Sequence, residues 1–77
     1  MTDLLAKVTK VVRDQGELKG DPSPDAHLIH DLGFDSLSLV ELTLALERQF
    51  EREIPDADAM GLRSVREIAA YLARPPA

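Results

Sequence analysis

The chain has 77 residues, enough for one domain that buries about 60% of its unfolded surface but too few to enclose an active site. Its 14 acidic and 9 basic residues give a net charge of −5, which disfavours nucleic acid and anionic membranes as partners and favours basic protein surfaces. Because the chain contains no cysteine, it has no disulfide, no thiolate metal site and no thiol nucleophile of its own.

The N-terminus does not show the pattern of a secretion signal. Residues 1–4 lack the basic stretch and the long apolar run of a secretion signal, and no window approaches the length of a membrane span. We therefore expect a cytoplasmic, monomeric protein. Residues 1–77 are expected to form one domain with a flexible tail at 74–77, and that tail is also consistent with a cut from a longer chain.

Apolar residues at helical spacing predict a first helix that ends near Gln15, just before Gly16. The spaced residues are Leu4, Leu5, Val8, Val11 and Val12. Residues 17–34 then contain several glycines and prolines and predict a long loop, a feature that in compact domains is usually functional or disordered. The residues expected to anchor this loop to the core are Leu28, Ile29 and Leu32.

The end of this loop places a hydroxyl group where an enzyme could reach it. Gly33 allows a tight turn, and Asp35 is a favoured N-cap whose carboxylate can accept from the first free amides of a helix. Ser36 then falls in the first helical turn and should face solvent, which makes it a candidate attachment point. The alternative is an ordinary helix-start serine, but Leu39 stands where a capping box headed by Ser36 needs Glu or Gln.

The second predicted helix, residues 36–51, has two apolar faces when residues are placed 100° apart. One face is the expected core stripe and contains Leu39, Leu42, Thr43, Leu46 and Phe50. The other has no evident folding role, and exposed leucines alone are common on protein surfaces. Because its apolar residues cluster among carboxylates, we interpret it as a docking face for a partner with an apolar patch ringed by Arg or Lys. The docking face comprises Asp35, Leu37, Val40, Glu41, Leu44 and Glu47.

Two further helical segments are predicted. A short one starts near Asp56, a candidate cap, with Met60 as its apolar anchor and Gly61 at its end. The last starts at Ser64 with a capping box, in which Ser64 accepts from the Glu67 amide and Glu67 accepts from the Ser64 amide, and it ends at Pro75.

One long and one short connection between these helices predict an all-α fold, a small antiparallel four-helix bundle with a short third helix. Because only 4% of the residues are aromatic, its core should be aliphatic. The expected core residues are Leu42, Leu46, Phe50, Ile54, Ile68 and Leu72.

The segment DLGFDSLSLVEL, residues 31–42, resembles the phosphopantetheine attachment motif of acyl carrier proteins. The similarity continues through residues 45–47, Phe50 and residues 53–56, so it covers nearly the whole chain. It implies a stand-alone carrier that is not itself an enzyme, with Ser36 joined by a phosphodiester to a 4′-phosphopantetheine arm. The thiol of that arm would hold acyl groups as thioesters, which supplies the sulfur that a cysteine-free chain lacks.

The resemblance also implies the partners. They are a phosphopantetheinyl transferase and the acyl-loading, ketosynthase-type and acyl-transfer enzymes of fatty acid or polyketide-type biosynthesis, with basic docking surfaces. Phe34 stands where bacterial fatty-acid carriers often have a small residue, and Ser38 and Leu39 also depart from the frequent pattern, which leaves the pathway open. Two alternatives remain: an aminoacyl or peptidyl carrier of a nonribosomal peptide-type pathway, and an unmodified helical adaptor.

His27 and His30, three residues apart in the loop, raise the question of a metal site. Two histidines without a third clear ligand are more often surface residues, so no metal is expected. No catalytic residue is expected either, because no Ser-His-Asp arrangement is evident.

Overall fold

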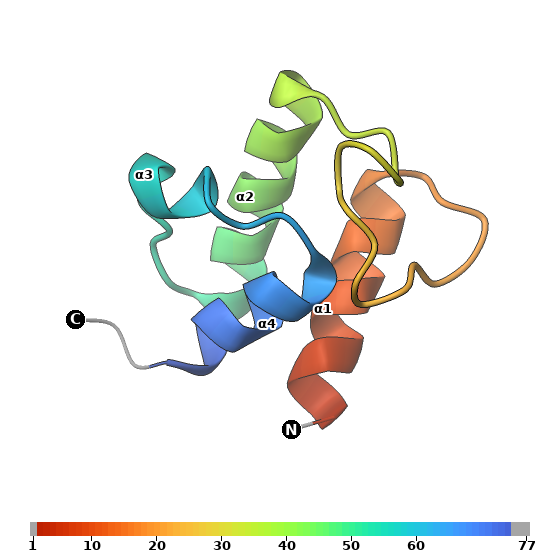
Figure 1. The fold of residues 1–77 in the computed structure, drawn as a ribbon. Helices are drawn as coiled ribbons and strands as arrows, with labels where there is room; N and C mark the ends of the chain where they lie inside the picture. Colours follow the sequence, from red (N-terminus) through yellow and green to blue (C-terminus); the bar gives the residue numbers. More distant parts are fainter. Residues whose placement is uncertain (1, 75–77) are drawn as a thin grey trace.

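The computed structural model describes residues 2–74, which form four helices arranged as a small bundle (Figure 1). The helices are α1 (Thr2–Gln15), α2 (Ser36–Phe50), α3 (Asp56–Ala59) and α4 (Val65–Ala73). The predicted all-α fold with a long loop between the first two helices is confirmed. None of the helices in these residues is long and apolar enough to cross a membrane.

The core lies where α1 packs against both α2 and α4. It is almost entirely aliphatic, as predicted, and α1 contributes Val8 and Val12 with no exposed surface. Of the six predicted core residues, Leu42, Leu46, Ile54 and Ile68 are buried, while Phe50 and Leu72 are half-buried and pack against the core. The one aromatic side chain in the buried set is Phe34, from the end of the long loop.

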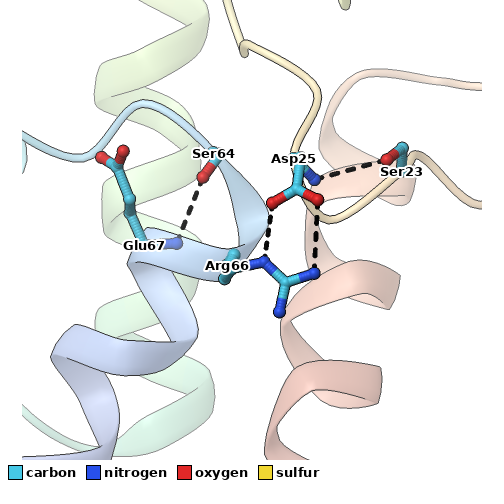
Figure 2. Close-up of polar contacts among 5 residues, drawn as sticks. All are labelled: Ser23, Asp25, Ser64, Arg66 and Glu67. Atoms are coloured by element: carbon cyan, nitrogen blue, oxygen red, sulfur yellow. Dashed lines mark hydrogen bonds and ion pairs between the residues drawn. The ribbon is translucent and has the colours of Figure 1, made fainter.

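The long loop is held by backbone bonds to the first turn of α4 and to the segment just before it. Leu28, which is fully buried, donates its amide to the Arg63 carbonyl at 2.8 Å, and the Arg66 amide donates to the Pro24 carbonyl at 2.9 Å. Figure 2 shows the ion pair that accompanies them, with the Arg66 guanidinium 2.6 Å from the Asp25 carboxylate.

The three predicted loop anchors differ in burial. Leu28 is buried and Leu32 is half-buried and packed on the core, but Ile29 is 46% exposed, so its prediction as an anchor was wrong. The bonds that hold Leu28 leave the neighbouring Ile29 side chain on the outside of the turn.

The start of α4 follows the predicted capping box in one of its two bonds. The Glu67 amide donates to the Ser64 hydroxyl at 3.2 Å (Figure 2). The Glu67 carboxylate, however, accepts from the Arg63 amide at 3.0 Å rather than from the Ser64 amide. The Glu67 side chain therefore bonds to Arg63, one residue before Ser64. Arg63 is also the residue whose carbonyl accepts from the Leu28 amide.

Helix α3 differs most from its sequence-based description. Asp56 is its first residue rather than its cap, and the N-cap position is Pro55, which makes no side-chain capping bond. Met60 lies past the end of the helix and is 83% exposed, so its prediction as the apolar anchor was wrong. Ala59 and Leu62 pack against the core instead.

The ends of α2 and α4 lie close to their predicted positions. Helix α2 stops one residue early, at Phe50, because Glu51 takes a left-handed conformation (φ 52°) as the C-cap. Arg74, the first residue of the predicted tail, is the C-cap of α4, and residues 75–77, including Pro75, lie outside the described residues.

Candidate functional site

The start of α2 is capped by Asp35, as predicted. Its side-chain Oδ1 accepts from the Ser38 amide at 2.8 Å, and its carbonyl accepts from the Leu39 amide at 2.9 Å. The bond from the Ser38 amide lowers the pKa of the Asp35 carboxyl below its usual value of 3.8. Because Asp35 does the capping, the hydroxyl of Ser36 is not needed to start the helix.

The turn before the cap is set by the backbone. Gly33 has a φ of +79°, a conformation that side chains disfavour, and its amide donates to the Ile29 carbonyl at 3.2 Å. The Phe34 amide then donates to the Leu28 carbonyl at 2.9 Å. These bonds bring Ser36 out of the loop as the first residue of α2, with its side chain exposed.

His27 has a structural part in the same loop. Its Nδ1 accepts from the amides of Ile29 and His30 at 3.1 and 3.2 Å, while its own amide donates to the Asp31 carboxylate at 2.8 Å. The rings of His27 and His30 are tilted by 41° to one another, with centroids 4.4 Å apart. His27 therefore caps the turn that leads toward Ser36, and the residues from 2 to 74 hold no group of three candidate ligands for a metal ion.

An open cavity of about 820 Å³ lies beside Ser36, between α2, α3 and the long loop. Its lining is mostly apolar. The core residues in that lining are only 1–3% exposed, so the open surface is formed by exposed and half-buried residues such as Ile29, Leu39, Val40 and Met60. Two half-buried polar residues of the lining, Thr43 and Glu47, already make hydrogen bonds within the protein. The Thr43 hydroxyl donates to the Leu39 carbonyl at 2.9 Å, and the Glu47 carboxylate accepts from the Ile54 amide at 2.7 Å.

The apolar residues of the predicted docking face are exposed and lie along α2 from Ser36 onward. Leu37 is 67% exposed, Val40 56% and Leu44 49%, and Glu41 is exposed among them. Asp35 is also exposed, with its carboxylate engaged in the cap.

Glu47 is the docking-face residue with a second role. It is half-buried, and its carboxylate holds the amide of Ile54 in the connection to α3. Sequence reasoning also missed two exposed apolar residues on the rim of the cavity, Met60 and Ile29. Their residue type suggested burial, and no sequence signal marks a side chain that a turn directs outward.

These features fit a phosphodiester-linked arm. The Ser36 hydroxyl is accessible, and it lies at the N-terminus of a 15-residue helix, where the helix dipole favours a negatively charged phosphate. The adjoining cavity has a mostly apolar lining.

Comparisons with known proteins agree with this geometry. Residues 1–72 match the family described as "Phosphopantetheine attachment site". The acyl carrier protein of Syntrophobacter fumaroxidans is 45% identical over 69 residues, which cover 88% of this chain and 85% of that protein. The acyl carrier protein of Bdellovibrio bacteriovorus is also 45% identical over 69 residues, with 86% of each chain covered.

A solved structure supports the same assignment. A chain from Mycobacterium tuberculosis, assigned as an acyl carrier protein, superimposes with a TM-score of 0.84 and 26% identity over 91% of this chain and 95% of that one. Taken together with the family match over nearly all of α1 to α4, these similarities show that the chain belongs to the acyl carrier proteins, non-enzymatic carriers of a 4′-phosphopantetheine group.

Proposed function

We propose that Ser36 bears the 4′-phosphopantetheine arm and that the protein delivers acyl thioesters to enzymes of fatty acid or polyketide-type biosynthesis. The observation that carries the proposal is the exposed Ser36 hydroxyl in the first turn of α2, at the mouth of an apolar cavity. Asp35 satisfies the cap without help from Ser36, so the serine is free to be modified at no cost to the helix.

The protein holds the arm and its acyl group where enzymes can reach them, and it does not catalyse the reactions itself. When bound, the arm supplies the thiol on which an acyl group is held as a thioester. Activation of the Ser36 hydroxyl belongs to a transferase that brings coenzyme A and magnesium. The first turn of α2 contributes by favouring the phosphodiester anion, an effect of about 0.3–1 kcal/mol at an exposed helix N-terminus.

The cavity supports an aliphatic cargo. Its volume of about 820 Å³ lies within the range typical of small-ligand pockets, and most of its accessible lining is apolar. Each methylene group that leaves water for such a wall contributes about 0.8 kcal/mol. Leu39 is half-buried and belongs to this lining.

The docking face supports the partner assignment. Leu37, Val40 and Leu44 form an exposed apolar stripe that begins next to Ser36, and Glu41 lies within it. A transferase and acyl-processing enzymes that carry an apolar patch with surrounding Arg or Lys would complement it in shape and charge. A cytoplasmic location, where coenzyme A is available, belongs to the same proposal.

Intact mass after incubation with coenzyme A, magnesium and a broad-specificity transferase tests the attachment site. Wild-type protein and the Ser38→Ala control should each gain the mass of one arm, since alanine at position 38 keeps the backbone amide that donates to the Asp35 carboxylate. Ser36→Ala should gain nothing and keep its helical circular dichroism. Modification of Ser36→Ala would overturn the site, and a wild-type chain that no transferase modifies would overturn the function.

The class of cargo is tested by loading the modified protein. Enzymes that activate fatty acids or short acyl groups should form a thioester with it, whereas amino-acid-activating enzymes should not. Selective loading with an amino acid would instead establish the aminoacyl carrier alternative.

A further inference from the structure

Phe34 occupies an unusual place for a loop residue two positions before Ser36. Its side chain is 3% exposed, and its ring lies against Gly16, the residue that follows α1. A β-carbon added at Gly16 would lie 2.9 Å from Cε1 and 3.0 Å from Cζ of that ring. Any side chain at position 16 would therefore push the ring, so the absence of one is what lets Phe34 pack there.

Backbone bonds on both sides make this contact a link between α1 and α2. The Gly16 amide donates to the Val12 carbonyl at 3.0 Å, which ties the glycine to the last turn of α1. The Phe34 amide donates to the Leu28 carbonyl at 2.9 Å, and Leu28 is itself bonded to Arg63. Asp35 is the one residue between Phe34 and Ser36 in the sequence, and its carboxylate is held by the bond from the Ser38 amide.

We propose that Phe34 is a positioning residue for arm transfer and that Gly16 leaves the space in which its ring packs. The packing of the ring against Gly16 fixes the turn that precedes Ser36. It therefore sets the direction in which the Ser36 hydroxyl faces the transferase. Phe34 and Gly16 act through the backbone and do not touch the arm. The inference rests on the proposed attachment at Ser36.

The chain offers a matched set of glycines for the test. Gly16 and Gly20 both lack a positive φ, so neither strains the backbone when it becomes alanine, but a β-carbon at Gly20 meets nothing within 4 Å. Gly16→Ala therefore displaces the ring, and Gly20→Ala is its control. Leu18 also lies near Gly16, with Cγ 3.3 Å from the added carbon, a contact that a flexible side chain relieves by a small shift.

A second substitution separates the ring contact from other effects. Phe34→Leu removes the two ring atoms that an alanine at position 16 would meet, Cε1 and Cζ, and keeps an apolar side chain. The double variant Gly16→Ala with Phe34→Leu should therefore restore the position of the turn. Val8→Ala, in the core of the bundle, lowers stability while leaving Gly16 and Phe34 themselves unchanged, and it controls for that loss.

Steady-state kinetics of arm transfer, measured on variants that circular dichroism shows to be folded, provide the readout. Gly16→Ala should lower kcat about tenfold, since small misplacements of a reacting group cost one to two orders of magnitude. Its KM should stay the same, because the docking face is unchanged. Gly20→Ala and Val8→Ala should keep the wild-type kcat, and the double variant should recover most of it.

Three results would overturn the positioning role: a wild-type kcat in Gly16→Ala, an equal loss in Val8→Ala, or no recovery in the double variant. These results are distinct from a failure of the proposed function. If the wild-type protein itself gains no arm at Ser36, attachment at that residue is refuted and the positioning role falls with it.

Discussion

At the scale of single residues, capping the helix and exposing a hydroxyl are done by two neighbouring residues at the start of α2. Asp35 accepts from the Ser38 amide and completes the helix, whereas Ser36 contributes its exposed hydroxyl and nothing that the helix needs. This division explains how a helix N-terminus can carry a modification on its first residue. A serine that served as its own cap would lose that bond when its oxygen became part of a phosphodiester.

The Asp35 cap predicts a dependence of stability on pH. The bond from the Ser38 amide lowers the pKa of the Asp35 carboxyl in the folded protein relative to 3.8. A lowered folded-state pKa means that the stabilisation is fully present above the unfolded-state pKa and is lost as pH falls through the folded-state value. Urea midpoints of wild type and Asp35→Asn should therefore differ most at pH values well above 3.8 and converge as pH falls below 3.8 through the lowered folded-state pKa.

Asn keeps an oxygen that can cap, so Asp35→Ala is the companion variant and should be less stable than either at neutral pH. A constant difference between wild type and Asp35→Asn from neutral pH down to acid would contradict the assigned role of the charge.

The short helix α3 has little of its own to hold it. It is four residues long, has no side-chain cap, and buries none of its residues completely. Ala59 packs against the core, and the Tyr71 hydroxyl of α4 adds a side-chain hydrogen bond to the helix by donating to the Asp58 carboxylate at 2.7 Å. Since α3 forms part of the cavity wall, that bond also bears on access to the cavity.

Tyr71→Phe removes the bond and keeps the ring, over which Arg52 lies at 5.1 Å. Amide exchange in residues 56–59 should accelerate in this variant, while exchange in α1 should be unchanged. The bond to Asp58 raises the pKa of Tyr71 above 10.0, so the tie is complete below that pH and is lost as pH rises through the folded-state value. Equal exchange in the two proteins would show that α3 is held by other contacts.

How well the elements could be predicted depended on how local their causes are. The loop, the Asp35 cap and the Ser64 to Glu67 bond follow from residues within a few positions of one another, and the structure confirms them. Met60 and Ile29 were wrongly assigned to the core because apolar character does not reveal the direction of a side chain at a turn.

The candidate site shows the same limit. Ser36 and the exposed stripe on α2 were readable from motif and periodicity, because both lie within one helix. The contact between Gly16 and Phe34 joins residues far apart in the sequence, so Phe34 appeared only as a departure from the family pattern. The bond from Ile54 to Glu47 likewise spans a connection whose path the sequence does not specify.

For the whole molecule, the net charge of −5 includes exposed carboxylates both on the docking face and far from it. Reversing one charge of each kind tests whether partners bind at the docking face. Glu41 is exposed within the docking face and is the better position to reverse, because Glu47 also holds the Ile54 amide and its reversal would disturb the connection to α3. Asp3, exposed on the first turn of α1, is the matched control. Figure 1 shows the start of α1 and the start of α2 at opposite ends of the molecule.

Glu41→Lys and Asp3→Lys change the net charge by the same amount, so they separate local from overall electrostatics. If a basic transferase surface meets the docking face, Glu41→Lys should slow association and flatten its dependence on ionic strength, because rim charges act mainly on the association rate. Asp3→Lys should have a much smaller effect on both quantities. Stopped-flow association rates across a range of salt concentrations measure this, and equal effects of the two reversals would indicate that net charge alone attracts the partner.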